Sequence, residues 1–163
     1  MTSLPQSSGC FVCGADNPYG LQLVFIRDET GVFTEFVPEA RHCGYPGMLH
    51  GGIMASLLDE TLGWAASVIK RRYFLTADLR IRYRRPVPAG RHVRVNGRYL
   101  GDKAGFWRAE GEIVDADGVV YASATGLFTS APDEAHERFL RETRSRYAPN
   151  RVDPFGDLPE CNR

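Results

Sequence analysis

The stretch GYPGMLHGGIMASLLDETLGWAA, residues 44–66, decides the fold of this chain. A glycine-rich segment ends at residues 50–52 and opens a long apolar run. The helical spacing of its apolar side chains predicts a helix over residues 51–69. Little polar surface remains on this helix, which indicates that protein surrounds it. Asp59 and Glu60 lie in its middle, and because carboxylates are almost never fully buried without a partner or a function, they mark a candidate site.

The sequence on either side of this helix reads as β-strands. Residues 74–84 alternate, with Leu79, Ile81 and Tyr83 on one face and arginines on the other, as in a half-buried antiparallel strand. The predicted strands cover residues 21–26, 32–37, 74–84, 92–100, 106–114 and 119–128. We therefore expect an α+β fold, in which a curved antiparallel sheet of about six strands wraps round one long central helix.

Length and composition indicate one globular domain. The 163 residues carry 20 basic and 20 acidic side chains, so no global field attracts nucleic acid or an anionic membrane. The longest apolar segment, residues 53–69, is interrupted by two acids, which argues against a transmembrane span. The first residues lack the features of a secretory signal, and we expect a cytoplasmic protein. We assign residues 1–8 to a flexible tail, residues 9–130 to the domain, and residues 131–163 to a C-terminal helix, over 132–147, and a tail.

The central helix can polarise a carbonyl group at its start. Its first amides have no partner inside the helix and carry the positive end of the helix dipole. Glycines at positions 51 and 52 let a substrate approach closely, so the N–H of Gly51 or Gly52 is a candidate oxyanion donor. Asp59 lies eight residues after Gly51, which is roughly 12 Å along the axis. If both act on one carbonyl carbon, they come from two chains related by a two-fold axis.

Several motifs together resemble the hotdog-fold acyl-CoA thioesterases of the PaaI-like group. They are the segment 47–52, the acid Asp59 nine positions after the histidine, the run 76–79, Tyr83-x-x-Pro86, and the segment 124–128. The similarity spans residues 9–130. It implies a hotdog fold, hydrolysis of an acyl-CoA thioester without a metal or redox cofactor, and a homodimer or homotetramer that shares its sites across a dimer.

The resemblance also implies roles for individual residues. Asp59 is the general base or the nucleophile, His50 holds the loop or the substrate thioester, and Thr76 positions the attacking water. Several relatives carry Asn six residues before the histidine, where this chain has Gly44. This departure leaves open a protein that binds thioesters without hydrolysing them. A hotdog dehydratase or hydratase is a second alternative, although the Gly-Gly helix start with Asp59 fits hydrolysis better.

Each of these residues also has a structural interpretation. Asp59 could be a buried carboxylate bonded to Ser56 or to a strand, and Glu60, pointing about 100° away, a surface or interface acid. His50 could simply cap the helix, and Thr76 could be an ordinary strand residue. Trp64 belongs to the core by default, and alternatively it forms a wall of the acyl pocket.

Three basic residues are candidates for binding the phosphates of coenzyme A. Arg84 and Arg85 precede Pro86, and arginine suits bidentate phosphate contacts. Lys103, in a hairpin loop, is the third. The simpler interpretation of the arginine face of residues 80–84 is a solvated sheet face.

The cysteine pattern does not predict a metal site. Cys10-x-x-Cys13 supplies two ligands at most, whereas a structural zinc site needs four. His42 and Cys43 could complete a site only if the fold brought them there. Relatives with a similar Cys-Phe-x-Cys-Gly start favour a packed pair of thiols, and we expect these cysteines, with Cys161, to be reduced.

Overall fold

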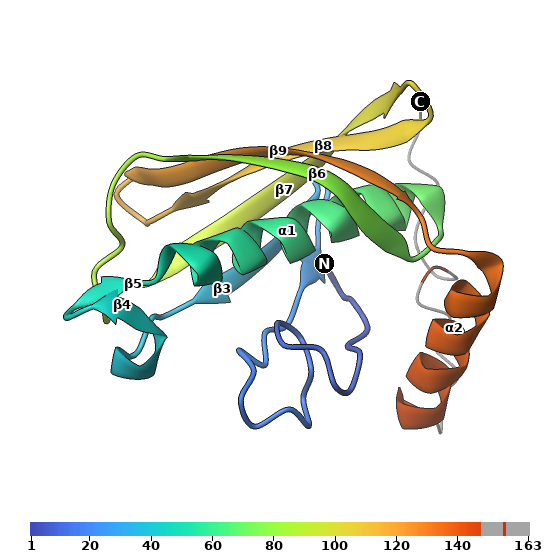
Figure 1. Ribbon diagram of the computed structural model, residues 1–163, viewed down its shortest axis with the longest axis horizontal. Helices are drawn as coiled ribbons and strands as arrows, with labels where there is room; N and C mark the ends of the chain where they lie inside the picture. Colours follow the sequence, from blue (N-terminus) through green and yellow to red (C-terminus); the bar gives the residue numbers. More distant parts are fainter. Residues whose placement is uncertain (148–154, 156–163) are drawn as a thin grey trace.

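In the computed structural model, which describes residues 1–147 and 155, a curved antiparallel sheet wraps around the helix α1, Gly51–Lys70 (Figure 1). Within these residues the sheet has seven strands in the order β1-β2-β3-β7-β8-β9-β6. The strands are β1 (Thr2–Ser3), β2 (Ile26–Arg27), β3 (Val32–Phe36), β6 (Phe74–Tyr83), β7 (Val93–Lys103), β8 (Phe106–Val114) and β9 (Val120–Ser130). The predicted α+β hotdog architecture is confirmed, including the central helix and the four long strands after it.

A small subdomain leads into α1. The 3-10 helix Ala40–His42 is followed by a two-stranded ribbon of β4 (Cys43–Tyr45) and β5 (Met48–Leu49). The amide of His50 bonds to the carbonyl of His42 at 2.9 Å, which holds the ribbon against the start of the helix. This ribbon therefore fixes the position of the glycine-rich helix start.

Glycines let α1 lie directly on the sheet. A Cβ at Gly97 of β7 would lie 2.9 Å from the carbonyl oxygen of Thr61, and one at Gly63 of α1 would lie 2.1 Å from the ring of Phe74. Because these atoms are absent, three leucines of the helix reach complete burial. They are Leu57, Leu58 and Leu62. Burying each side chain contributes about 1.5–3 kcal/mol, so the packing of α1 is a main source of stability.

The strand expected at residues 21–26 is largely absent. Only Ile26 and Arg27 pair as β2, while Gln22 has a φ of 53° that breaks an extended backbone. The amides of Leu21 and Leu23 bond instead to the carbonyls of Phe11 and Val12, at 2.7 and 2.9 Å. The apolar pattern arises because this segment covers the core as an irregular loop, paired with the cysteine segment.

The N-terminal residues also differ from the expected flexible tail. Thr2 and Ser3 form β1, which pairs with β2, and Leu4 is 4% exposed. This segment therefore completes one edge of the sheet. At the other end of the chain, the predicted terminal helix is confirmed as α2, Asp133–Tyr147, which lies beside the C-terminal end of α1 (Figure 1). The predicted tail after it lies outside the described residues, except for Phe155.

Candidate active site

The start of α1 is capped by a histidine. His50 precedes the helix in an extended conformation, and its Nδ1 accepts a hydrogen bond from the amide of Gly52 at 2.9 Å. The geometry therefore shows that His50 caps the helix, as one of its two interpretations expected. Because Nδ1 is the acceptor, the neutral ring carries its proton on Nε2. The exposed imidazole can thus cap the helix and still present an N–H donor.

One amide at this helix start is free. The ring of His50 accepts a hydrogen bond from the amide of Gly52, and the carbonyl of His50 accepts hydrogen bonds from the next two amides. The N–H of Gly51 has no hydrogen-bond partner among the described residues. It lies at the positive end of the helix dipole, where an oxyanion is favoured. Of the two glycines predicted as donors, the geometry leaves the amide of Gly51 available.

Tyr83 is a site residue that the sequence reasoning did not single out for a role. Its hydroxyl donates to the carbonyl of Gly51 at 3.0 Å, and its ring lies 3.6 Å from where a Cβ of Gly51 would be. The strand alternation contained the signal, because it places Tyr83 on the same face as Leu79 and Ile81. This contact ties the first turn of α1 to the end of β6.

Gly44, which stands where several relatives have asparagine, leaves room for the ring of His50. A Cβ at Gly44 would lie 2.8 Å from Cδ2 of His50, well inside van der Waals contact. The imidazole therefore packs on the bare backbone of β4, where several relatives have a side chain. A residue with a side chain at this position would displace the ring that caps α1.

The middle of α1 carries a carboxylate held by a strand. Thr76 of β6 donates a hydrogen bond from Oγ1 to Asp59 at 2.8 Å. Burial raises the pKa of Asp59, and the bond from Thr76 opposes that rise. Ser56 bonds to the carbonyl of Gly52 and not to Asp59. The two residues predicted to act together are therefore in contact, next to a bulge in β6 between Thr76 and Asp78.

Gly51 and Asp59 are not in reach of one substrate carbonyl within one chain. They lie on one continuous helix, eight positions apart, which separates them by roughly 12 Å along its axis. The structure thus presents two separate groups of candidate residues on each chain, each of which we call a half-site: a free amide with His50 at the helix start, and a carboxylate with Thr76 in the middle of the helix.

Glu60, which we expected to be a surface or interface acid, is half-buried within the chain and is directed towards Trp64 and Cys10. Its Oε1 accepts a hydrogen bond from the indole N–H of Trp64 at 3.2 Å and lies 3.9 Å from Sγ of Cys10. Burial, together with the neighbouring Cys10, raises the pKa of Glu60 to about 7. Trp64 is 3% exposed and packs edge-on against Tyr73 and Phe74, which places it in the core.

The packed pair of thiols expected from the sequence is present. Cys10 and Cys13 are free, and Cys13 is buried. A hydrogen bond from the Cys13 thiol, helped by backbone amides, lowers the pKa of Cys10 to about 6. The same bond and burial raise the pKa of Cys13.

The three basic candidates lie at opposite ends of α1. Arg84 bonds to Ser123 and Arg85 to the carbonyl of Val120, both next to Tyr83 and the helix start. Lys103 follows Asp102, which pairs with Lys70 at the last turn of α1. Within one chain, therefore, only the two arginines lie near the helix start.

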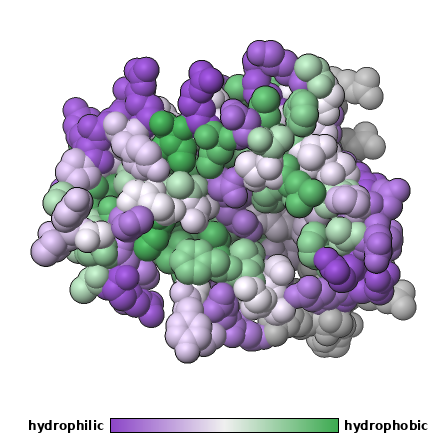
Figure 2. Space-filling view, in the orientation of Figure 1, coloured by the Kyte–Doolittle hydropathy of each residue, from purple (hydrophilic) through white to green (hydrophobic). Residues whose placement is uncertain are grey.

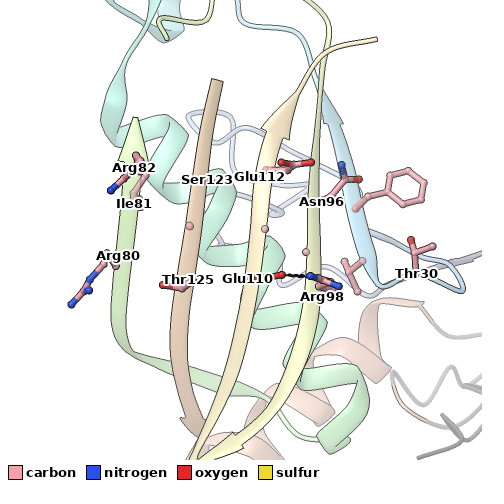
Figure 3. Close-up of a pocket in the computed structure, with 15 residues that line it drawn as sticks. Thr30, Arg80, Ile81, Arg82, Asn96, Arg98, Glu110, Glu112, Ser123 and Thr125 are labelled. Atoms are coloured by element: carbon pink, nitrogen blue, oxygen red, sulfur yellow. Dashed lines mark hydrogen bonds and ion pairs between the residues drawn. The ribbon is translucent and has the colours of Figure 1, made fainter. Parts of the chain in front are cut away.

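A cavity of about 800 Å³ lies on the face of the sheet that is turned away from α1 (Figure 3). Arg80 and Arg82 line it from β6, and Glu110 pairs with Arg98 across β8 and β7. Its lining mixes these charged side chains with apolar ones such as Phe33 and Ile81. Neither half-site contributes to it.

No helix in the described residues combines the length and apolar character needed to cross a membrane.

Comparisons with known proteins identify relatives of this chain. Residues 46–122 match the family model of the thioesterase superfamily. The acyl-coenzyme A thioesterase THEM4 of Bos taurus is 31% identical over 128 residues, which cover 76% of this chain and 52% of that protein. The chain thus spans about half the length, or less, of the curated relatives it matches.

Solved structures share the fold. Protein RHA08564, described as a thioesterase superfamily protein, matches with a TM-score of 0.67 and 30% identity, covering 74% of this chain and 62% of that one. The E. coli PaaI protein from the phenylacetic acid degradation operon has a TM-score of 0.61 at 19% identity, over 69% of this chain and 81% of that one. At the latter identity the likeness concerns the fold alone.

Proposed function

This chain is a hotdog-fold member of the thioesterase superfamily, and from that premise we propose that it hydrolyses an acyl-coenzyme A thioester to a free acid and coenzyme A. One observation carries the proposal: the same helix presents a free amide at Gly51 and a carboxylate at Asp59 held by Thr76. Thioester hydrolysis needs both kinds of group, a donor for the developing oxyanion and a base or nucleophile for the attack.

In the proposed reaction the amide of Gly51 stabilises the oxyanion, and Nε2–H of His50 donates to the thioester. The amide of Gly52 holds the imidazole in place. Asp59 takes a proton from a water molecule as that water attacks the carbonyl carbon. Alternatively, its carboxylate attacks the carbon itself, and once coenzyme A has left, water hydrolyses the acyl-aspartyl anhydride to the free acid and restores the carboxylate. The tetrahedral intermediate then collapses, the C–S bond breaks, and the thiolate of coenzyme A leaves and takes up a proton. Thr76 orients the carboxylate and the water.

We propose that each complete site forms between two copies of the chain. The spacing of about 12 Å between Gly51 and Asp59 requires a second helix, and two antiparallel helices across a two-fold axis supply it twice. β6 is the edge strand of the sheet, and most of its side chains are exposed. On the face that carries β6 and α1, Figure 2 shows hydrophobic patches among charged residues. Leu75 and Tyr83 are exposed large side chains of β6.

Arg84 and Arg85 would bind the phosphates of coenzyme A near the helix start. Lys103 can serve the same site only if the partner chain brings its hairpin there. The reaction belongs in the cytoplasm, where reduced thiols such as the three described free cysteines persist.

The test is release of free thiol from a panel of acyl-CoA substrates by the full chain and by Asp59→Ala. We expect turnover by the parent chain and a loss of about 10³-fold in the variant, as for removal of a general base. Stoichiometric acyl-CoA binding without thiol release would make the chain a binding protein. Addition or loss of water at the acyl chain, again without thiol release, would make it a dehydratase or hydratase. An unchanged rate in Asp59→Ala would remove this residue from the mechanism.

A further inference from the structure

Three potential metal ligands meet beside the middle of α1. The Sγ atoms of Cys10 and Cys13 and a carboxylate oxygen of Glu60 all lie within 4.8 Å of one another. In the part of the chain that the structure describes, this is the one such group of three or more ligands. The proposed reaction uses none of them. We refer to these three residues as the Cys-Glu cluster.

The loop that carries the two cysteines is already folded as a ligand turn. Sγ of Cys10 accepts hydrogen bonds from the amides of Val12 and Cys13, both at 3.3 Å. The amide of Gly14 bonds to the carbonyl of Cys10 at 3.0 Å, and a Cβ at Gly14 would lie 2.4 Å from that same oxygen. The turn therefore requires glycine after the second cysteine. Amides aimed at a sulfur favour its thiolate, the form that binds metal.

The cluster lacks a cation of its own. No ion pair among the described residues involves Glu60, and its hydrogen-bond donors are neutral groups: the indole N–H of Trp64 at 3.2 Å and the thiol of Cys10, whose Sγ lies 3.9 Å from Oε1. A buried carboxylate is costly unless it is neutralised, paired or bound to a metal. A divalent cation would offset two of the three negative charges that two thiolates and a carboxylate carry. It would also leave the indole N–H bonded to the ligating carboxylate, as outer partners of metal ligands commonly are.

The spacing of the cluster fits zinc. Zinc binds thiolate at about 2.3 Å and carboxylate oxygen at about 2.0–2.2 Å, so ligand atoms at tetrahedral corners are about 3.5–3.8 Å apart. Sγ of Cys10 lies 3.9 Å from Oε1 of Glu60. All three ligand atoms lie within 4.8 Å of one another, so closing the site needs movements of no more than about 1 Å in the loop and in the end of the Glu60 side chain. Thiolate ligands select zinc over magnesium or calcium.

We propose that Cys10, Cys13 and Glu60 bind one zinc ion, with water as the fourth ligand, and that this ion clips the N-terminal loop to α1. The sequence alone supplied two ligands, and the fold supplies the third from a helix 47 residues further along the chain. His42 and Cys43 are not part of the site. Cys43 bonds to the carbonyl of Glu39, in the segment before the helix start.

The experiment titrates the reduced full chain with zinc, and with cobalt as a spectroscopic probe. Every protein carries Cys161→Ser, which removes the thiol outside the described residues. We expect one equivalent of tightly bound zinc, and a cobalt complex with thiolate charge-transfer bands and the intense visible bands of tetrahedral coordination. Cys13→Ser and Glu60→Gln should each weaken binding at least tenfold. Cys43→Ser is the matched control and should leave binding unchanged.

Several outcomes overturn the proposal. They are a folded parent chain that binds less than a stoichiometric amount of zinc, an octahedral cobalt spectrum, and zinc binding that Glu60→Gln does not weaken. Formation of a Cys10–Cys13 disulfide in a chain that takes up no zinc when reduced also counts against it. The first result needs no variant, so the proposal can be tested even if a substitution prevents folding.

Discussion

Asp59 and Glu60 are neighbours on α1, and they face different parts of the molecule. Asp59 bonds to Thr76 on the edge strand β6, at the side where the sheet has no further strand. Glu60 points towards Trp64 and Cys10, and thus towards the core and the N-terminal loop of its own chain. The difference follows from helix geometry, because consecutive residues are rotated by about 100°.

The comparison shows how one short acidic pair can serve two purposes. A carboxylate at an open edge can meet a substrate and a second chain, whereas one facing inward can only organise its own fold. We therefore expect changes at Asp59 to alter the reaction and changes at Glu60 to alter the attachment of the N-terminal loop.

The largest effect is expected from the matched substitutions Asp59→Asn and Glu60→Gln. Each replaces a carboxylate by an amide of the same shape. Asp59→Asn should lower kcat by about 10³-fold, because an amide can neither take a proton nor attack, while zinc binding stays intact. Glu60→Gln should change kcat/KM by no more than several-fold and weaken zinc binding. Equal losses of rate in both variants would break the comparison.

Mixed dimers test whether Asp59 serves another chain. Gly51→Pro removes only the free amide, since proline is favoured at the first helical position and His50, with ψ of 134°, suits a following proline. Asp59→Ala and Gly51→Pro homodimers should both be inactive. A mixed dimer has one intact site, so equal mixing should recover about a quarter of the parent activity.

Gly51→Ala is the control for this experiment, because it keeps the amide and its Cβ would make ordinary contacts with Tyr83 at 3.6–3.9 Å. It should retain far more activity than Gly51→Pro. No recovery after demonstrated exchange of subunits would mean that Asp59 and Gly51 do not form a shared site.

The sequence predicted the helix and the four strands after it, and the resemblance assigned Asp59 and Thr76 to one site without predicting the hydrogen bond between them. These features follow from local periodicity and from a motif whose spacing is fixed by the fold. The strand expected at residues 21–26 failed for a physical reason. Leu23 and Phe25 face the core, yet the amides of Leu21 and Leu23 bond to the carbonyls of the cysteine loop instead of to a neighbouring strand. Periodicity reports burial and does not report which backbone groups pair.

The sequence alone also could not predict the environment of Glu60. Its partners come from a loop about 50 residues earlier, and no local pattern connects a Cys-x-x-Cys turn to a helix face. The sequence also did not show why residue 44 is glycine. The reason is that the imidazole ring of His50 occupies the space that a side chain at Gly44 would need. The features that the sequence did not predict therefore depend on contacts between segments that are far apart in the chain.

A smaller effect is expected from Thr76→Val, which removes the hydrogen bond to Asp59 and keeps the shape of the side chain. A hydrogen bond to a charged group contributes about 1.5–3 kcal/mol, so kcat/KM should fall by roughly 10–100-fold, less than in Asp59→Asn. Thr76→Ser is the control and should restore most of the rate, because it returns the hydroxyl. A Thr76→Val enzyme with full activity would reduce Thr76 to an ordinary strand residue.

The smallest effect on the reaction is expected from Trp64→Phe, on the Glu60 side of the helix. Phenylalanine keeps the packing against Tyr73 and Phe74 but cannot donate to Glu60. Losing this bond should cost about 1 kcal/mol of unfolding free energy in denaturant melts and weaken zinc binding by about tenfold. The preference among acyl chain lengths should stay the same, because Trp64 is buried on the Glu60 side of α1 and not on the side where Asp59 contacts Thr76. A shifted preference would instead make Trp64 a wall of the acyl pocket and bring the two sides of the helix into one site.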